Sequence, residues 1–340
     1  MILPVFGKRM KVAIGLMALW VAFVVPCKAA ARQGSEVRAG ELSPRLHEGE
    51  FFSASLQKKA KYRVLLPQKY ATDGKRFPVL FLLHGLYGDY TNWSKLTKLV
   101  AYSEDLDLII AMPGVGDSWY ANSPSDPAAR YEDFVVRDFI AEIDGKYRTI
   151  ADREHRFIAG LSMGGYAAVY MAEKYPQLFS YAGGFSAALD APLNLDERKP
   201  EFRPSLLGAF GPHGSQTRHD NDVFSLLEAA GQAKLVPIYL DCGEEDMFLD
   251  VNRRLAAKLQ TMKAPYQYRE YPGDHNWQYW DAAILRFLNV LRSAGLVSGS
   301  VPCSIDALFR GEARILQVFR PVRVWMDYAY RFGASFLLIS

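Results

Sequence analysis

The chain has 340 residues, half of them hydrophobic, which is enough to bury the core of one large α/β domain. Its formal charge of +3 depends on the first 31 residues, which hold no acidic residue and four basic ones: Lys8, Arg9, Lys11 and Lys28. Removing these four charges from +3 leaves −1. The rest of the chain therefore lacks the basic excess of a nucleic-acid-binding protein, and we expect no such partner.

The first 31 residues are typical of a secretory signal peptide. Three basic residues precede a 14-residue apolar stretch, Val12 to Val25, and Ala29 to Ala31 form a small-residue cleavage site. The stretch is shorter than the roughly 20 apolar residues that a membrane span needs. We expect an exported protein, periplasmic or secreted, without a stable membrane span after the signal is removed. An uncleaved N-terminal anchor is the alternative.

A linker at residues 32–50 is followed by residues 51–67, where apolar and polar residues alternate as in antiparallel strands. Short apolar runs then predict six further strands, at Val79–Leu83, Leu106–Ala111, Arg156–Ala159, Tyr181–Phe185, Val236–Asp241 and Gln267–Tyr271. Helical spacing appears at Tyr131–Tyr147, Met163–Lys174, Leu249–Met262 and Trp277–Leu291. Strands that alternate with helices predict an α/β fold over residues 51–296, with a mostly parallel central sheet flanked by helices on both faces.

Two stretches lack a sustained period. Residues 189–222 are rich in Pro, Gly, Arg and Asp and predict a long structureless insertion, a candidate lid. Residues 297–340 predict a C-terminal tail of unknown role, with a surface-lying amphipathic helix as the alternative. After signal removal the cysteines are Cys242 and Cys303; we expect Cys242 to be a buried thiol, and a disulfide between the two stays open.

Gly160-Leu161-Ser162-Met163-Gly164 is a G-x-S-x-G pentapeptide that follows a predicted strand and begins a predicted helix. This strand–turn–helix setting is the one in which the motif carries a nucleophilic serine. Small residues are needed because the turn is sharp and brings backbone close to the serine. We predict Ser162 as a nucleophile; a tight glycine-rich turn without catalysis is the alternative.

A serine needs an adjacent base, and His275 is the best placed of the six histidines. It lies between the last predicted strand and the last predicted helix, at the carboxyl ends of the strands, where functional sites of such sheets are usually found. The acid should lie between Ser162 and His275 in the chain. We choose Asp246, which follows the Gly243 turn after the penultimate strand. Asp241 is expected to end that strand, and the alternatives are Glu244, Glu245 and Asp250.

An oxyanion hole needs two backbone N–H groups. We predict those of Met163, directly after the serine, and of Leu86, in the loop after the third strand. His84 in the same loop is expected to orient the turn. His213 and His219 lie beside Asp220 and Asp222, but no helix or strand pattern fixes their spacing, so we expect no metal there. The predicted serine chemistry implies no metal and no organic cofactor.

These pieces, taken in order, resemble the "Putative esterase" family related to esterase D, which includes S-formylglutathione hydrolases, secreted feruloyl and acetyl-xylan esterases, and mycolyltransferases. The matching residues are His84 to Gly88 with Asn92-Trp93, Pro113 to Asn122, Gly160 to Gly165, Asp241 to Asp250, and Gly273-Asp274-His275 with Trp277 and Trp280. The resemblance covers residues 51–291. It implies an α/β-hydrolase fold, a Ser162–Asp246–His275 triad, and Leu86 and Met163 as oxyanion donors. Export departs from the cytosolic S-formylglutathione hydrolases, and the lipid-handling surface of mycolyltransferases is not recognisable.

Four aromatic residues lie in loops expected near the site: Trp93, Trp119, Tyr120 and Trp277. They are candidates to line an acyl or aromatic pocket, and core packing is an equal alternative.

The sequence therefore predicts a serine carboxylic-ester hydrolase that acts through an acyl-enzyme on Ser162. Small or medium acyl esters, including carbohydrate-linked ones, are the expected substrates. An acyltransferase that passes the same acyl group to a sugar or other alcohol is one alternative. A non-catalytic cell-envelope binding protein is the other.

Overall fold

The computed structural model describes residues 43–230 and 235–300. The predicted signal peptide, Cys303 and all but the first residues of the predicted tail lie outside these ranges. Within the described residues, no helix is both long enough and apolar enough to cross a membrane.

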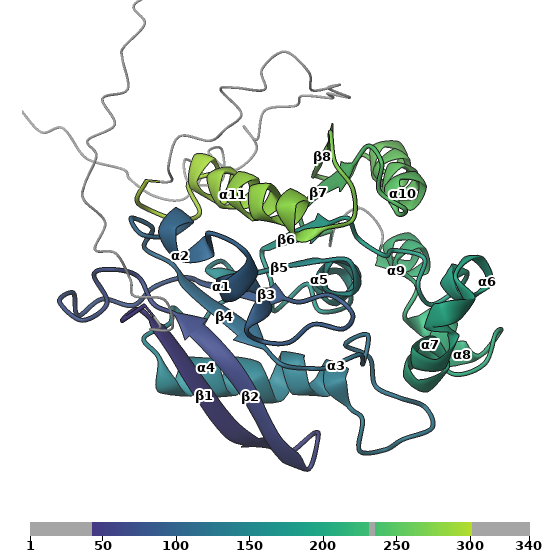
Figure 1. Ribbon diagram of the computed structural model, residues 1–340, viewed down its shortest axis with the longest axis horizontal. Coiled ribbons are helices and arrows are strands. Elements are labelled where there is room, and N and C mark those ends of the chain that lie inside the picture. Colours follow the sequence, from purple (N-terminus) through teal and green to yellow (C-terminus); the bar gives the residue numbers. More distant parts are fainter. Residues whose placement is uncertain (1–42, 231–234, 301–340) are drawn as a thin grey trace, which may run out of the picture. The chain divides into compact units, whose positions relative to one another are not determined.

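Eight strands form a single sheet in the order β1-β2-β4-β3-β5-β6-β7-β8 (Figure 1). β1 pairs antiparallel with β2 and β2 with β4, and all later pairings are parallel, as predicted. The bounds are β1 (Leu46–Ser53), β2 (Lys58–Leu65), β3 (Val79–Leu83), β4 (Ile109–Pro113), β5 (Arg156–Leu161), β6 (Tyr181–Phe185), β7 (Ile238–Gly243) and β8 (Tyr266–Tyr271).

The start of β1 corrects the predicted linker, which was expected to reach residue 50. Leu46 already pairs with Leu65 of β2, so the sheet begins five residues before the predicted domain boundary at 51. The alternation was hidden because β1 is an edge strand whose first half carries mostly polar residues.

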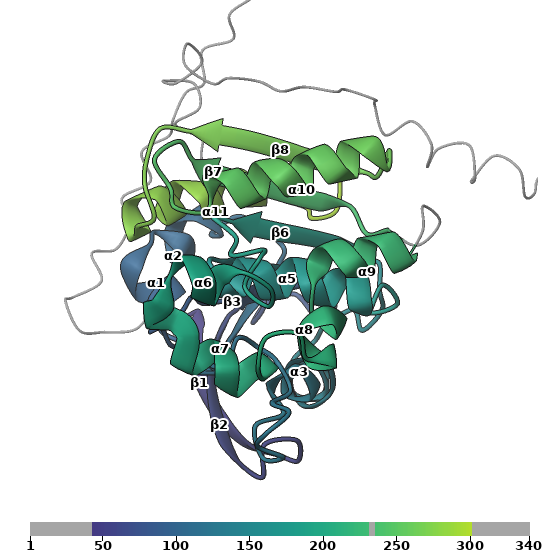
Figure 2. The same cartoon turned by 90° about the vertical axis from the view of Figure 1, so that its right-hand side faces the viewer.

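Helices cover both faces of the sheet, and the buried apolar side chains divide into two clusters accordingly (Figures 1 and 2). One face carries α1 (Asn92–Leu96), α2 (Leu99–Tyr102) and α11 (Trp277–Ser293). The other carries α3 (Tyr131–Asp133), a π-helical turn η1 (Phe134–Phe139), α4 (Ile140–Lys146), α5 (Met163–Lys174), α9 (Val223–Ala230) and α10 (Leu249–Thr261). Parallel strands buried on both faces read as continuous apolar runs, which is why the sequence revealed them.

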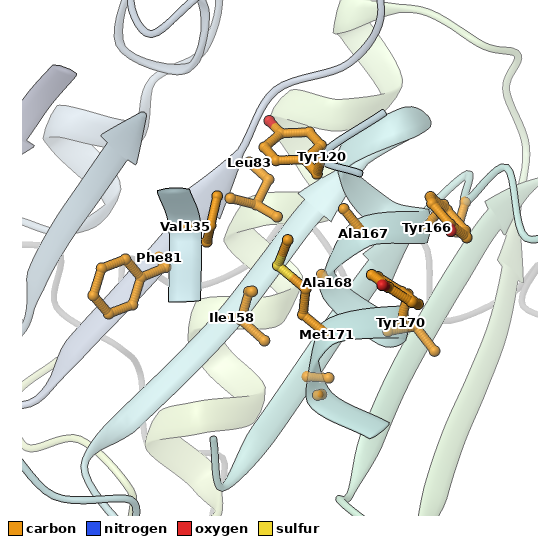
Figure 3. Close-up of a cluster of buried hydrophobic side chains, with 14 of the residues drawn as sticks. Phe81, Leu83, Tyr120, Val135, Ile158, Tyr166, Ala167, Ala168, Tyr170 and Met171 are labelled. Atoms are coloured by element: carbon orange, nitrogen blue, oxygen red, sulfur yellow. The ribbon is translucent and has the colours of Figure 1, made fainter. Parts of the chain in front are cut away.

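The central helix α5 packs directly on the sheet. Ala167, Ala168 and Met171 of α5 lie against Phe81 and Ile158 of the strands in one buried cluster (Figure 3). The small alanines let the helix approach the sheet closely. This packing fixes the first turn of α5 relative to the end of β5.

Residues 189–222 correct a second expectation, because they are not structureless. They form α6 (Leu195–Arg198), a 3₁₀ turn η2 (Pro200–Phe202), α7 (Arg203–Phe210) and α8 (Gln216–Asp220). Each helix has eight residues or fewer, too short for a 3.6-residue period to repeat. The segment is held by a buried ion pair between Arg218 and Asp196, 2.9 Å, and by Phe210 against Trp119. Its action as a lid stays a prediction.

Backbone passes very close to backbone where β5 meets α5. A methyl group added at Gly164 would lie 2.5 Å from His84 O and 2.6 Å from Leu83 O. One added at Gly160 would lie 2.5 Å from the Gly164 carbonyl. Both glycines are therefore required by space, and they let the ends of β3 and β5 lie side by side.

We predict that Gly164→Ala lowers the free energy of unfolding by about 1–3 kcal/mol, because its methyl group must push backbone aside. Gly145→Ala is the matched control. Gly145 lies in α4 with nothing within 4 Å of the added atom, so alanine should leave stability unchanged or raise it by roughly 0.5–1 kcal/mol. Urea denaturation measures both. A Gly164→Ala midpoint equal to that of Gly145→Ala would contradict the steric account.

Candidate active site

Ser162 occupies a strained turn between β5 and α5. Its backbone has φ 53° and ψ −117°, a region that residues other than glycine rarely adopt. The turn is held by the last residue of β6 and by the turn that follows it: Ser162 N donates to Phe185 O at 2.9 Å, and Ala188 N donates to Ser162 O at 3.1 Å. Strain of this kind persists only where the surroundings fix the backbone, and it is common at functional sites.

The structure brings Ser162, His275 and Asp246 together in one hydrogen-bonded chain. His275 Nε2 lies 3.0 Å from Ser162 Oγ, and His275 Nδ1 lies 2.9 Å from Asp246 Oδ2. The other carboxylate oxygen of Asp246 accepts the N–H of Phe248 at 2.8 Å. Because the Asp246 side chain is fully buried, water does not compete for these bonds.

The loops that carry the acid and the histidine are bonded to each other. Glu244 N donates to Tyr271 O at 2.9 Å, and Glu245 N donates to Gly273 O at 3.0 Å. These bonds fix the position of the loop that carries Asp246 relative to the loop that carries His275. The chain therefore places both side chains from the ends of adjacent strands, β7 and β8.

The other candidate acids lie elsewhere. Glu244, Glu245 and Asp250 are exposed. The Asp241 side chain forms a buried ion pair with Arg286. Its Oδ2 accepts hydrogen bonds from Arg286 Nε at 2.9 Å and from the Tyr239 hydroxyl at 2.9 Å. Burial raises the pKa of the Asp241 carboxyl, and the Arg286 charge opposes that rise. Among these carboxylates, Asp246 is the one that contacts His275.

The loop after β3, which holds Leu86, lies against the serine. A methyl group added at Gly85 would lie 3.4 Å from Ser162 Cβ. The Gly85 carbonyl accepts the His84 ring N–H at 2.8 Å and Gly88 N at 3.2 Å. In a planar trans peptide the N–H points opposite to the C=O, so these bonds also fix the direction of Leu86 N–H.

His84 is held in one tautomer. Val115 N donates to His84 Nε2 at 3.3 Å, so the proton lies on Nδ1, which donates to Gly85. Burial lowers the pKa of His84 and keeps the ring neutral. The Tyr120 hydroxyl donates to His84 O at 3.0 Å. Met163, the other predicted donor, is the first residue of α5, where backbone N–H groups lack an intrahelical acceptor.

The four predicted pocket aromatics are mostly buried. Trp93, Trp119 and Tyr120 are 1%, 1% and 0% exposed. Trp93 Nε1 donates to Leu83 O at 2.9 Å, and Trp119 Nε1 donates to Ser205 Oγ at 3.0 Å. Trp277 is half-buried and packs edge-on against Trp93 with ring centres 5.6 Å apart. All four thus have packing partners, and their contact with a substrate stays a prediction.

The remaining sequence candidates do not join this site. His213 Nε2 contacts Asp196 at 2.9 Å in the insertion, and Cys242 is a buried free thiol. Burial raises the pKa of the Cys242 thiol, which disfavours the reactive thiolate. Within residues 43–230 and 235–300, no three His, Cys, Asp or Glu side chains form a group suited to a metal ion.

Two aromatic rings that the sequence did not single out as site residues flank His275. Trp280 lies edge-to-face with the imidazole at 4.8 Å between ring centres, and Phe248 lies at 5.1 Å. The available signal was position: Phe248 lies two residues after the acid, and Trp280 lies in the first turn of the helix that follows the histidine.

The sheet order, the helices on both faces and a serine at a strand–turn–helix junction define a protein of the α/β-hydrolase class. Among solved structures, the fluorophosphonate-binding serine hydrolase F of Staphylococcus aureus matches with a TM-score of 0.66 at 26% identity, over 72% of this chain and 97% of that one.

A model of the "Putative esterase" family matches residues 53–290, so the chain belongs to this family and is an esterase. It is 28% identical over 248 residues to an acetyl esterase of Caldicellulosiruptor saccharolyticus, which covers 69% of this chain and 93% of that protein. It is also 28% identical over 262 residues to the esterase Rv1288 of Mycobacterium tuberculosis, which covers 70% of this chain. The chain spans only 57% of the length of that second relative.

We predict that His84→Phe lowers kcat for a p-nitrophenyl ester about 10- to 100-fold with little change in KM, because the Gly85 carbonyl loses its bond to the His84 ring and the Gly85–Leu86 peptide is held less firmly. His155→Phe is the control: His155 is half-buried, bonds Asp152 and lies just before the first residue of β5, at the other end of that strand from Ser162. Steady-state kinetics of the two variants decide the matter. Equal kcat values for both would show that His84 does not position the loop.

Proposed function

We propose that this esterase cleaves carboxylic esters through an acyl-enzyme on Ser162. The observation that carries the proposal is the continuous hydrogen-bonded chain from Asp246 through His275 to Ser162, with both distances at 3.0 Å or below. A serine hydroxyl becomes a useful nucleophile only when a base is within such reach.

In the first half of the reaction, Ser162 Oγ attacks the ester carbonyl carbon and its proton moves to His275 Nε2. Asp246 accepts a hydrogen bond from the N–H of His275 Nδ1, which keeps its proton, so Nε2 is free to act as the base and the resulting imidazolium is stabilised. The negative charge on the carbonyl oxygen is met by the N–H groups of Leu86 and Met163. The C–O bond then breaks, and the leaving alcohol takes the proton from His275.

In the second half, water attacks the acyl group on Ser162 and gives its proton to His275. The tetrahedral intermediate collapses, the carboxylic acid leaves, and Ser162 Oγ regains its proton. In this proposal His275 Nε2 carries the proton in both halves of the reaction.

The proposed substrates are small or medium acyl esters, including carbohydrate-linked ones. Support comes from the acetyl esterase relative, which matches across 93% of its own length. The acyl group and the alcohol are compared directly by a screen of acetyl, butyryl, feruloyl and thioester substrates.

We also propose that the protein is exported, periplasmic or secreted. The support is the basic and apolar pattern of residues 1–31, with its small-residue site at Ala29 to Ala31. N-terminal sequencing of the protein from the cell envelope or medium should begin close to residue 32. A mature protein that retains residues 12–25 would contradict the proposal.

We predict that Ser162→Ala lowers turnover of p-nitrophenyl acetate by about 10⁴-fold or more while the melting temperature shows a folded protein, because the nucleophile is gone. Substantial residual turnover in a folded variant would overturn the mechanism. Product analysis should find free acid equal to the alcohol released, even with added sugar. Acyl-sugar as the main product would instead indicate an acyltransferase.

Asp246 and Asp250 provide a matched control within the same experiment. Asp246→Asn should lower kcat by about 10⁴-fold, because the amide no longer holds the His275 tautomer. Asp250→Asn makes the same chemical change at an exposed position in the first turn of α10 and should leave kcat unchanged. Loss of activity in both variants would show that the effect does not come from the His275 contact.

A further inference from the structure

Three consecutive residues after β6, Ser186 to Ala188, form a buried turn beside the site. Ser186 has φ 47°, a positive value that is costly for a residue with a side chain. The turn lies against the start of α5, where a methyl group added at Gly165 would be 3.0 Å from Ala187 Cβ. No part of the proposed reaction uses these residues directly.

The first residue of the turn is linked to the histidine. Ser186 Oγ accepts the indole N–H of Trp280 at 3.2 Å, and the Trp280 ring lies edge-to-face with His275. Both Ser186 and Trp280 are buried, so the bond is shielded from water. The ring that packs against His275 is thus itself hydrogen-bonded to the turn.

The second residue is linked to the acid through Asn252 of α10. Asn252 Nδ2 donates to Ala187 O at 2.9 Å and to Phe248 O at 2.9 Å. Phe248 N in turn donates to Asp246 Oδ1. Asn252 is fully buried, and within the described chain its Oδ1 has no hydrogen-bond partner. Burying an amide oxygen without a partner costs free energy. The two bonds donated by Nδ2 are the interactions that offset this cost and keep Asn252 at this position.

The third residue is linked to the serine directly. Ala188 N donates to Ser162 O at 3.1 Å, and the preceding Phe185 O accepts Ser162 N at 2.9 Å. Each of the three turn residues therefore reaches a different member of the Ser162–His275–Asp246 chain.

We propose that the Ser186–Ala188 turn sets the relative placement of the triad, with Ser186, Trp280 and Asn252 as positioning residues. The inference rests on the proposed serine mechanism. Positioning matters because a displacement of about 1 Å in a reacting group can cost on the order of 10²-fold in rate. The first link bears on how His275 Nε2 approaches Ser162 Oγ, the second on where the Asp246 carboxylate lies, and the third on the placement of the Ser162 backbone. None of the three requires contact with a substrate.

The test compares two identical substitutions in the full chain. Asn252→Leu removes both Nδ2 bonds at similar side-chain volume. Asn289→Leu removes the same kind of bond, from Nδ2 to the carbonyl four residues earlier, but that bond lies within α11, to Leu285 O, and not at the turn. We expect Asn252→Leu to lower kcat for p-nitrophenyl acetate about 10- to 100-fold with KM little changed, and Asn289→Leu to leave both unchanged.

A second readout is the downfield ¹H resonance of the hydrogen-bonded His275 Nδ1 proton, which should shift or broaden in Asn252→Leu and not in Asn289→Leu. A folded Asn252→Leu with the kcat and resonance of Asn289→Leu would overturn the proposal. The resonance reports placement even without turnover, so this failure is distinguishable from failure of the serine mechanism, which Ser162→Ala tests.

Ser186→Ala keeps the proposal falsifiable if Asn252→Leu does not fold. It removes the acceptor for Trp280, together with a side-chain hydrogen bond to the buried Cys242 thiol, and we expect a similar fall in kcat and a changed resonance. Tyr102→Phe is its control, since it removes a hydroxyl that bonds Asp281, the residue after Trp280 on α11, at 2.8 Å. Equal kcat and resonance for Ser186→Ala and Tyr102→Phe would overturn the link to His275.

Discussion

The close approach of backbone between the ends of β3 and β5 and the start of α5 is the constraint on which the rest of the structure depends. It is possible only because residues 160 and 164 are glycines, whose missing side chains leave room for the carbonyls of Leu83 and His84. The end of β5 presents Ser162, and the end of β3 leads into the loop that holds Leu86. One steric condition thus brings the proposed nucleophile and the proposed oxyanion donor to the same place.

Asp241 of β7 and Asp246 of the loop after it have different partners and therefore different roles. Asp241 is paired with Arg286 in the protein interior, where breaking the pair would leave a buried charge. Asp246, five residues later, is paired with His275 and a backbone N–H. The first carboxylate joins α11 to the sheet, and the second serves the histidine. Residue type alone does not distinguish the two aspartates. Their positions do, because Asp241 still lies within β7 and Asp246 lies in the loop beyond the end of that strand.

The parallel strands and the long helices could be predicted because burial on both faces gives unbroken apolar runs, as at Val79–Leu83 and Tyr181–Phe185, which matched their predicted bounds. The first strand and the short helices of residues 189–222 could not, since an edge strand is largely polar and short helices show no repeat. At the site, chain order and motif setting were enough to choose Ser162, Asp246 and His275, which the structure brings together. The supports at Ser186, Asn252 and Trp280 depend on contacts between distant segments, which no local pattern records.

Ser162 is the proposed nucleophile because the loops around it place a histidine and an aspartate within hydrogen-bond reach of its hydroxyl. Labelling the full chain with a fluorophosphonate tests this most directly, since the serine oxygen displaces fluoride and keeps the phosphonyl group. The account predicts one phosphonyl group per chain, located on Ser162 by peptide mapping, with ester hydrolysis lost in proportion to labelling. A group found on another residue, or full labelling that leaves hydrolysis intact, would contradict it.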